Sequence, residues 1–475
     1  MKKKFIRDIS ANSLQVIINQ VCGLVIFYVL SAYFSKNDFG EINWSLAILL
    51  TAFSILSFGI DQVTVKKIAS GEDAHSVLSL YTTHVLLAGS LFYGFLLVSY
   101  FIFRGFYEHH NLLLFLGIGK LMIFLSTPFK QLANGLEKFR ALLYMSVCSN
   151  IIRGSSLILF SLFSKPYLTF VIIIFITGDL AELLLSFFIT KKILKVPVSI
   201  KPTRLAYLNL LRESMPQVGV VIFTSAIARF DWIILGVLAS NIIVAEYSFA
   251  FKVFELTTLP LLVIAPVLTP LFTRLFYSPA NTPAPEKIDD LLILLRFEMI
   301  IASLVALVLN ILWIPVIDFI THGKYGSVNR HTIFILSVCM PFIYANNFLW
   351  TINFAKSGLK KIFYIFFITF LINVISDLAL IPFFGAKGAA MGYLIAILIQ
   401  FILFIIKTDF PAFKKKGYSI LLCPIASFAS GALAVLLFTS TWAILVMSVF
   451  FFFLILIFSR QLRFADRQLL RRLRG

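Results

Sequence analysis

An arginine and an aspartate lie two positions apart in the stretch AIARFDWIILG, residues 226 to 236, where almost every other side chain is apolar. Residues i and i+2 of a helix point to different sides, so Arg229 and Asp231 are not placed to neutralise each other. Each charge then needs a partner of its own, or water, because an unpaired charge in apolar surroundings is costly. Both side chains are therefore candidates for contact with a charged ligand or an ion.

Charged residues lie inside several long apolar runs of the chain, including the one above. The basic members are Lys120, Arg153, Arg229, Lys252 and Arg296, and the acidic members are Asp179, Glu182, Asp231, Glu255, Glu298 and Asp377. If each run is a membrane helix, four of the basic residues fall about nine to fourteen residues from a helix start, near the middle of the bilayer. The spacing predicts that these helices surround a polar cavity.

The basic residues differ in the acids that neighbour them in sequence. Lys252 and Glu255 are three positions apart, so an ion pair that holds the structure together and a role in the cavity are both open. Arg153 and Arg229 have no acidic neighbour three or four positions away. That absence favours a role for the two arginines in the cavity.

Asp179 and Glu182 are two like charges on one face of the predicted sixth helix. Their repulsion favours binding of a proton or a cation, unless Lys120, Arg153 or a bound cation lies close. The alternative is a hydrogen-bonded pair that holds the helix against its neighbours. We take Asp179, Glu182, Asp231 and Glu255 as candidates for ion coupling.

The composition identifies the surroundings of these charges. The chain has 60% hydrophobic residues, 52 Phe in 475 positions, 13% charged residues and a mean hydropathy of +0.96. It is an all-α polytopic membrane protein, because apolar runs of about 20 residues span the bilayer and are too long for barrel strands. We predict about fourteen spans: 9–34, 42–61, 77–103, 111–129, 141–163, 167–190, 215–237, 243–272, 291–320, 332–353, 362–381, 386–406, 418–438 and 441–459.

The loop charges predict the orientation. With a cytoplasmic N-terminus, inside segments hold 30 Lys and Arg and outside segments hold six. This split places both termini in the cytoplasm. The basic tail at 460–475 could be an amphipathic helix on the membrane surface, but we favour its interpretation as an orientation signal. The same distribution explains most of the net charge of +19, so the basic composition does not require a nucleic-acid partner. The start MKKKF is expected to lead into a first membrane helix, not a signal peptide.

The chain also repeats itself. RDISANS from Arg7 aligns with RESMPQV from Arg212, and FGEINWS from Phe39 aligns with VAEYSFA from Val244, both at an offset of 205. Two lobes of six helices around a central cavity, followed by two extra helices, account for these matches. The predicted domains are 1–195 and 196–407 for the lobes, 408–459 for the two additional helices and 460–475 for the tail.

Several motifs resemble a known family. FGEINW enters the second helix, SFGIDQVTVKKIA leaves it, MPQVG opens the seventh, and IPFFGAKGAAMGYLIA joins the eleventh and twelfth. Together with the lobes they resemble the polysaccharide (Wzx-type) flippases of the multidrug/oligosaccharidyl-lipid/polysaccharide (MOP) exporter superfamily. The resemblance implies a flippase in the bacterial inner membrane that moves undecaprenyl-diphosphate-linked oligosaccharide, such as an O-antigen or capsule repeat, to the periplasmic leaflet. It also implies coupling to H⁺ or Na⁺ and contact with polysaccharide polymerase machinery.

A diphosphate headgroup calls for buried cations. The residues expected to bind it are Lys120, Arg153, Arg229 and Lys252. A lipid II flippase remains open as an alternative, as does a MATE-like drug or cation exporter, although the latter would require a cavity rich in carboxylates.

Catalysis is not expected. A membrane polymerase or glycosyltransferase normally needs a substantial outer loop, and the longest outer loops here are about ten residues. LGIGKL is not a phosphate-binding loop, because Lys120 is followed by Leu121 where Ser or Thr is required. The six His show no metal-ligand spacing and the four Cys form no CxxC motif, so neither metal nor cofactor is predicted.

Overall fold

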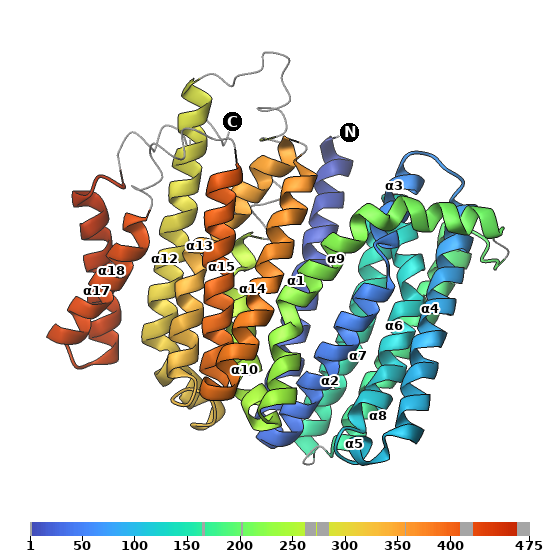
Figure 1. Ribbon diagram of the computed structural model, residues 1–475, viewed down its shortest axis with the longest axis horizontal. Helices are drawn as coiled ribbons and strands as arrows, with labels where there is room; N and C mark the ends of the chain where they lie inside the picture. The colour runs from blue at the N-terminus through green and yellow to red at the C-terminus, as the bar shows by residue number, and fades with distance from the viewer. Residues whose placement is uncertain are drawn as a thin grey trace. The chain divides into compact units, whose positions relative to one another are not determined.

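The computed structural model is helical throughout the residues that it describes, which are 2–163, 167–200, 203–261, 272, 285–356, 358–408 and 421–462 (Figure 1). Eleven of these helices are long and apolar enough to cross a membrane, and two shorter apolar helices, Ile17–Tyr33 and Leu422–Leu437, accompany them. Many large apolar side chains on these helices are exposed, among them Phe163 at 86% and Leu436 at 83%. Such a surface matches lipid, and the chain is a multi-pass membrane protein.

Each predicted span has a helix in the structure. Their bounds are α1 Lys2–Tyr33, α2 Lys36–Leu56, α4 Ala74–Ile102, α6 Leu112–Gly135, α7 Phe139–Phe163, α8 Leu168–Ile189, α9 Arg204–Leu238, α10 Asn241–Thr257, α12 Pro285–Thr321, α13 Arg330–Ala355, α14 Leu359–Phe384, α15 Ala386–Lys407, α17 Leu422–Leu437 and α18 Thr441–Phe458. Short α3 Ile60–Ala69, α5 Arg104–His109 and η1 Thr190–Leu194 connect some of them. The count of fourteen crossings stays a prediction, because parts of the eighth and thirteenth spans and residues 463–475 of the tail lie outside the described residues.

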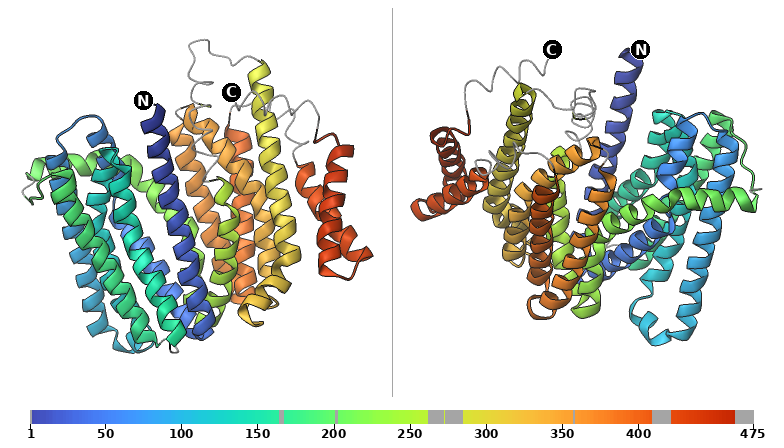
Figure 2. Two further views of the ribbon diagram at one scale, coloured as in Figure 1. Left: turned by 180° about the vertical axis from the view of Figure 1, so that it is seen from behind. Right: turned by 45° about the horizontal axis from the view of Figure 1, so that its top comes forward.

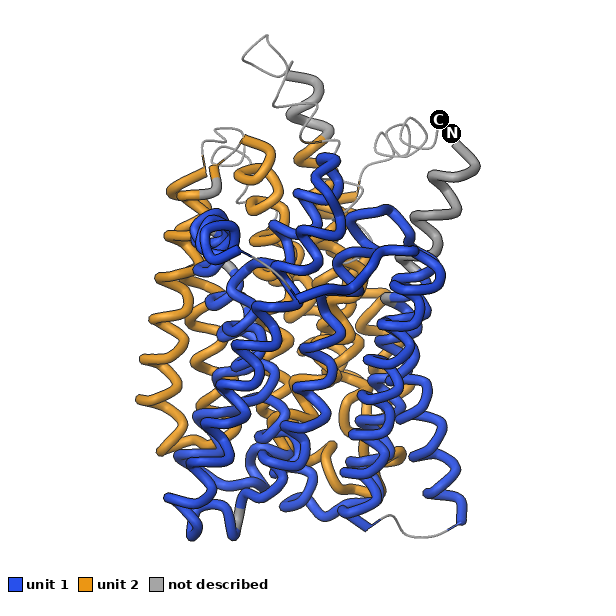
Figure 3. The backbone as a smooth tube through the Cα atoms, turned by 90° about the vertical axis from the view of Figure 1, so that its right-hand side faces the viewer, with its two compact units in different colours: residues 1–245 blue, residues 246–475 orange. Residues whose placement is uncertain are grey.

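The helices form two compact units, residues 1–245 and 246–475 (Figure 3). In unit 1, α6 is the central helix and packs against α2, α3, α4, α7 and α8, while α1 packs on α7. Buried apolar side chains such as Phe129, Leu132 and Met145 hold α6 to its neighbours. Four of the charged side chains that α6, α7 and α8 carry are buried in the interior of unit 1: Lys120, Arg153, Asp179 and Glu182.

Unit 1 also contains α9, which packs against α2 and α3. The first part of α9 lies across the end of the other helices of unit 1, and the rest turns to run along them (Figures 1 and 2). The Trp44 indole N–H donates to the Ile233 carbonyl at 3.2 Å. A Cβ at Gly236 would lie 2.0 Å from the Trp44 ring, so this position needs glycine for the two helices to meet.

Unit 2 is built on α12, α13, α14 and α15, with α17 and α18 as a hairpin beside α12 (Figure 2). Its core includes Leu295, Phe348, Phe404 and Phe452, all essentially without solvent exposure. The loop after α12 is held by Asp318, which accepts from the backbone N–H of Gly326 at 2.7 Å.

The repeat has a structural counterpart. α2 begins at Lys36 and α10 at Asn241, which are 205 positions apart, the offset of the sequence match. The boundary between the units falls after Ala245, whereas the sequence places the lobe boundary at residue 195. The packing of α9 on α2 accounts for the later boundary, and the four predicted domains remain predictions.

Candidate functional site

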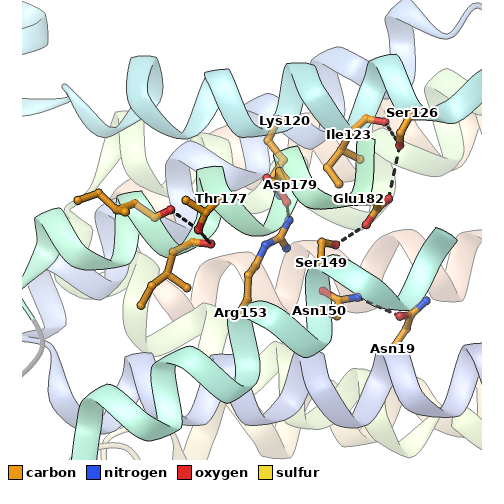
Figure 4. A network of polar contacts seen from close by, with 12 residues as sticks. Asn19, Lys120, Ile123, Ser126, Ser149, Asn150, Arg153, Thr177, Asp179 and Glu182 are labelled. Carbon is orange, nitrogen blue, oxygen red and sulfur yellow. Dashed lines mark hydrogen bonds and ion pairs between the residues drawn. The ribbon is translucent and has the colours of Figure 1, made fainter. Parts of the chain in front are cut away.

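Three helices of unit 1 bring two cations to one carboxylate. Lys120 of α6 lies 3.4 Å from Asp179 of α8 through Nζ and Oδ2, and Arg153 of α7 contacts the other carboxylate oxygen through Nη2 (Figure 4). Asp179 has no exposed surface, and Lys120 and Arg153 are exposed by 8% and 7%. Such a group is kept inside a membrane protein only when its charges offset one another.

Glu182, one turn further along α8, has a different set of partners. Lys130 of α6 donates to Glu182 Oε1 at 2.7 Å, and the Ser149 hydroxyl of α7 donates to Oε2. Ser126 adds a longer contact at 3.5 Å. Figure 4 shows Glu182 between Ser126 and Ser149, separate from the Asp179 group.

Asp179 and Glu182 therefore do not face each other as an uncompensated like-charged pair. Each carboxylate has basic partners of its own, because Lys120 and Arg153 lie at Asp179 and Lys130 lies at Glu182. We call these five residues the unit 1 charge cluster. Counted by formal charge, its three basic and two acidic side chains leave one positive charge in excess.

The local sequence explains why the cluster can assemble. A Cβ at Gly119 would lie 2.5 Å from Asp179 Oδ2, so glycine in α6 is what lets the carboxylate approach. Phe175, one turn before Asp179, lies beneath both cations, with Arg153 Cζ 5.0 Å and Lys120 Nζ 5.9 Å from the ring centroid. Cation–π contacts of this kind stabilise a charge that has lost its water.

A further acid, Asp61 of α3, lies near the Lys130 end of the cluster. Burial raises the pKa of Asp61 from 3.8 to about 6, against the opposing effects of a hydrogen bond with Ser57 and the positive charge of Lys130. The helix that carries Asp61 is not among the membrane-spanning helices. When Asp61 is ionised it balances the net charge of the cluster, and when it is protonated the cluster is positive.

Arg229 and Asp231 lie on different sides of α9, as their spacing predicts. Asp231 has no exposed surface and accepts from the Trp232 backbone N–H at 2.9 Å. Arg229 is half-buried, with its guanidinium carbon 4.4 Å from the Trp232 ring centroid. The indole thus covers one side of the arginine.

In unit 2, Lys252 donates to Glu255 at 2.7 Å along α10, which is the ion-pair geometry that their spacing allows. Asp377 of α14 is fully buried and accepts from Asn373 at 3.3 Å. The roles given to Lys120, Arg153, Arg229 and Lys252 in substrate binding, and to Asp179, Glu182, Asp231 and Glu255 in coupling, remain predictions.

Sequence reasoning missed Lys130 and Asp61. Lys130 was expected in a cytoplasmic loop because the apolar run ends at residue 129, but α6 continues to Gly135 and carries Lys130 inward, where its side chain is 16% exposed. Arg153 does have an acidic partner, and it comes from α8. Spacing along one helix carries no information about either contact.

The helical fold and the buried charge cluster define a multi-pass membrane protein with charged side chains inside its helices. The family model described as "Polysaccharide biosynthesis protein" matches residues 5–276. This is more than half of the 475 residues, and the chain belongs to that family.

Solved structures show the same fold. "Lipid II flippase MurJ, inward closed conformation" superposes with a TM-score of 0.75 at 16% identity, covering 94% of this chain and 98% of the other. A multidrug resistance MATE family transporter of the MOP superfamily in an inward-facing conformation gives 0.65 at 12%, covering 85% and 99%. A MOP superfamily transporter from Pyrococcus furiosus gives 0.58 at 13%, covering 86% and 96%. The search of curated proteins yields no match.

Proposed function

We propose that this protein is a flippase that moves an undecaprenyl-diphosphate-linked oligosaccharide across the bacterial inner membrane, from the cytoplasmic to the periplasmic leaflet. The observation that carries the proposal is the excess of cations in the unit 1 charge cluster. Membership of the polysaccharide biosynthesis family supports the oligosaccharide part of the substrate.

The charge balance favours an anionic headgroup. A diphosphate accepts bidentate hydrogen bonds from a guanidinium and further bonds from an ammonium group. Arg153 and Lys120 supply these two groups at one carboxylate, and Phe175 lies against both. Arg229, half-buried on Trp232, and Lys252 are the further cations that we assign to the substrate.

Coupling follows from competition for the same cations. A diphosphate that draws Lys120 and Arg153 to itself leaves Asp179 without a counter-charge in a fully buried position. The carboxylate then binds H⁺ or Na⁺, which ties movement of the substrate to movement of the ion. Glu182, with Lys130, takes the same role at the neighbouring turn, and Asp231 and Glu255 are the corresponding candidates in α9 and α10.

The unit 1 charge cluster argues against one of the two alternative functions and suits the other. A lipid II flippase handles the same diphosphate, so the charge cluster suits it equally, and only the family assignment favours a polysaccharide repeat. A drug or cation exporter needs an excess of carboxylates, whereas the cluster has three cations and two carboxylates. The orientation that we propose places both termini in the cytoplasm, from the 30 to 6 distribution of Lys and Arg in the sequence.

The test is a flipping assay with purified protein in proteoliposomes and a fluorescent undecaprenyl-diphosphate-linked oligosaccharide. We expect flipping by the wild type, none by Arg153→Ala and a partial rate with Arg153→Lys, which keeps charge without the bidentate fork. Lys138→Ala, which removes an exposed charge beyond the end of α6, is the matched control and should retain the wild-type rate. Equal flipping of a fluorescent undecaprenol-linked sugar without phosphate would contradict the charge argument.

The coupling step has its own measurement. A pH or Na⁺ gradient is imposed on the same proteoliposomes, and wild type is compared with Asp179→Asn and Glu182→Gln. Variants that flip substrate but no longer respond to the gradient support coupling through these carboxylates. A wild-type response in both variants removes them from the coupling step.

A further inference from the structure

Unit 2 contains a carboxyl group for which the function proposed above has no use. Glu298 of α12 lies in the span Leu291–Thr321 and is 4% exposed. Within the described part of the chain, neither of its carboxylate oxygens has a hydrogen-bond partner. An ionised carboxylate in such a place has lost its water without compensation, so the neutral acid is the favoured form.

The side of α12 on which Glu298 lies faces α13. Ala302, one turn further on, belongs to an apolar cluster with Leu261 and Tyr344, and Tyr344 lies near enough to Glu298 for their charges to interact. The Tyr344 hydroxyl does not serve the carboxyl, because it donates to the Thr257 carbonyl at the end of α10, at 3.2 Å.

Other charged groups on the helices around α12 face elsewhere. Arg296 is two positions from Glu298, on a different side of α12, and lies near Cys423 of α17. Arg330 and His331 begin α13, about 20 Å along that helix from Tyr344. α18, the third helix packed on α12, carries no titratable side chain. Among the described residues of the helices packed on α12, Tyr344 is therefore the titratable group that faces Glu298.

This arrangement contrasts with Asp179 and Glu182 of unit 1, whose carboxylates contact cations of neighbouring helices. We propose that Glu298 is a proton-binding site of unit 2, occupied while Tyr344 is bonded to α10. A shift of α10 that breaks the Tyr344–Thr257 bond frees the hydroxyl to donate to Glu298. The O–H bond of the acid then breaks, the proton passes to water, and the carboxylate keeps the electron pair.

The site joins α10 to α12 through named contacts. α10 also carries the Lys252–Glu255 pair, and Lys252 lies five positions before Thr257. A headgroup that engages Lys252 would pull on the helix whose end holds the Tyr344 hydroxyl. The use of the Glu298 proton in transport rests on the function proposed above, whereas its presence at rest does not.

Infrared spectroscopy tests the protonated state directly. The full-length protein in a detergent without carbonyl groups is measured at pH 7.5, and wild type is compared with Glu298→Gln and Glu255→Gln. We expect the C=O band of a protonated carboxyl to be lost in the first variant and kept in the second, because Glu255 forms an ion pair with Lys252. Glu298→Asp, which should shift the band, covers the case in which the glutamine variant does not fold. An unchanged band in all variants would overturn the assignment.

A transport assay distinguishes failure of the Glu298 proposal from failure of the proposed function. In proteoliposomes with an imposed pH gradient, Glu298→Gln should flip lipid-linked oligosaccharide and ignore the gradient. A gradient response equal to that of the wild type overturns the coupling role of Glu298. If the wild type moves no lipid-linked substrate, the proposed function fails, while the infrared band still decides whether Glu298 holds a proton.

Discussion

The guanidinium of Arg153 contacts the carboxylate of Asp179 across the interface of α7 and α8, and both side chains are almost completely removed from solvent. The same carboxylate also receives Lys120 from α6, so three helices of unit 1 meet at one acid. A buried charge that loses its partner costs about 3–5 kcal/mol, and the stability of unit 1 should therefore depend on this contact.

A single variant of Arg153 and a double variant of Arg153 with Asp179 distinguish an effect on protein stability from an effect on substrate binding. Arg153→Ala should lower the unfolding temperature, because Asp179 then keeps Lys120 alone, and Arg153→Ala with Asp179→Asn should restore much of it. Thermal unfolding in detergent and the amount of protein in the membrane measure this effect. If the double variant is stable but still does not flip substrate, Arg153 acts on the substrate as well. Full flipping by the stable double variant would leave only the ion-pair role.

Gly119→Ala should disturb the cluster from the side of α6. The new Cβ would lie 2.5 Å from Asp179 Oδ2, so the carboxylate must shift away from Lys120. We expect a loss of about 1–3 kcal/mol, as for an overpacked site. Gly94→Ala is the control, because a Cβ there meets nothing within 4 Å and alanine is the better helix former. Equal unfolding temperatures for the two variants would show that the approach of Asp179 to α6 is not tight.

Lys130→Met should destabilise unit 1 in a way that Glu182→Gln relieves. Lys130 is the cation in contact with Glu182, and without it the partners of the carboxylate among the described residues are the hydroxyl donors Ser149 and Ser126. The unfolding temperature of the single variant should fall, and that of the double variant should recover. A single variant as stable as the wild type would place Lys130 outside the cluster in solution.

Asp61 gives a pH dependence with a definite sign. Its pKa is raised from 3.8 to about 6, so the folded state holds this proton more tightly than the unfolded state does. Stability should be full below about pH 4, fall as pH rises to about 6, and then stay level, for a total loss of about 3 kcal/mol. Asp61→Asn should remove this fall, so the variant gains stability over the wild type at pH 7 and not at pH 4. Parallel unfolding profiles from pH 4 to 7 would contradict the shift.

Reporter fusions test the orientation. A reporter fused after Lys195 should read as cytoplasmic, and one fused after His322 should read as periplasmic. Lys195 follows η1 and His322 follows α12, so both fusions fall in segments that connect helices. The reverse result would overturn the orientation derived from the loop charges.

Much of the fold follows from the sequence because it depends on properties of short segments. Apolar runs of about 20 residues predict membrane helices wherever they occur, and each predicted segment has a helix in the structure. The offset of 205 between the repeats is also a property of the sequence, and the starts of α2 and α10 reproduce it. The different directions of Arg229 and Asp231 follow from helix geometry alone.

Only the tertiary structure decides which charges meet. The partners of Asp179 come from positions 59 and 26 residues earlier in the chain, on two other helices, and no spacing rule links them. Lys130 looked like a loop residue because hydropathy marks the end of an apolar run and not the end of a helix, and α6 continues for six residues beyond Phe129. That Glu298 has no hydrogen-bond partner among the described residues depends on what α13 places opposite it. A buried charge is visible in the sequence, but its state depends on neighbours that the folded packing of the helices alone brings near.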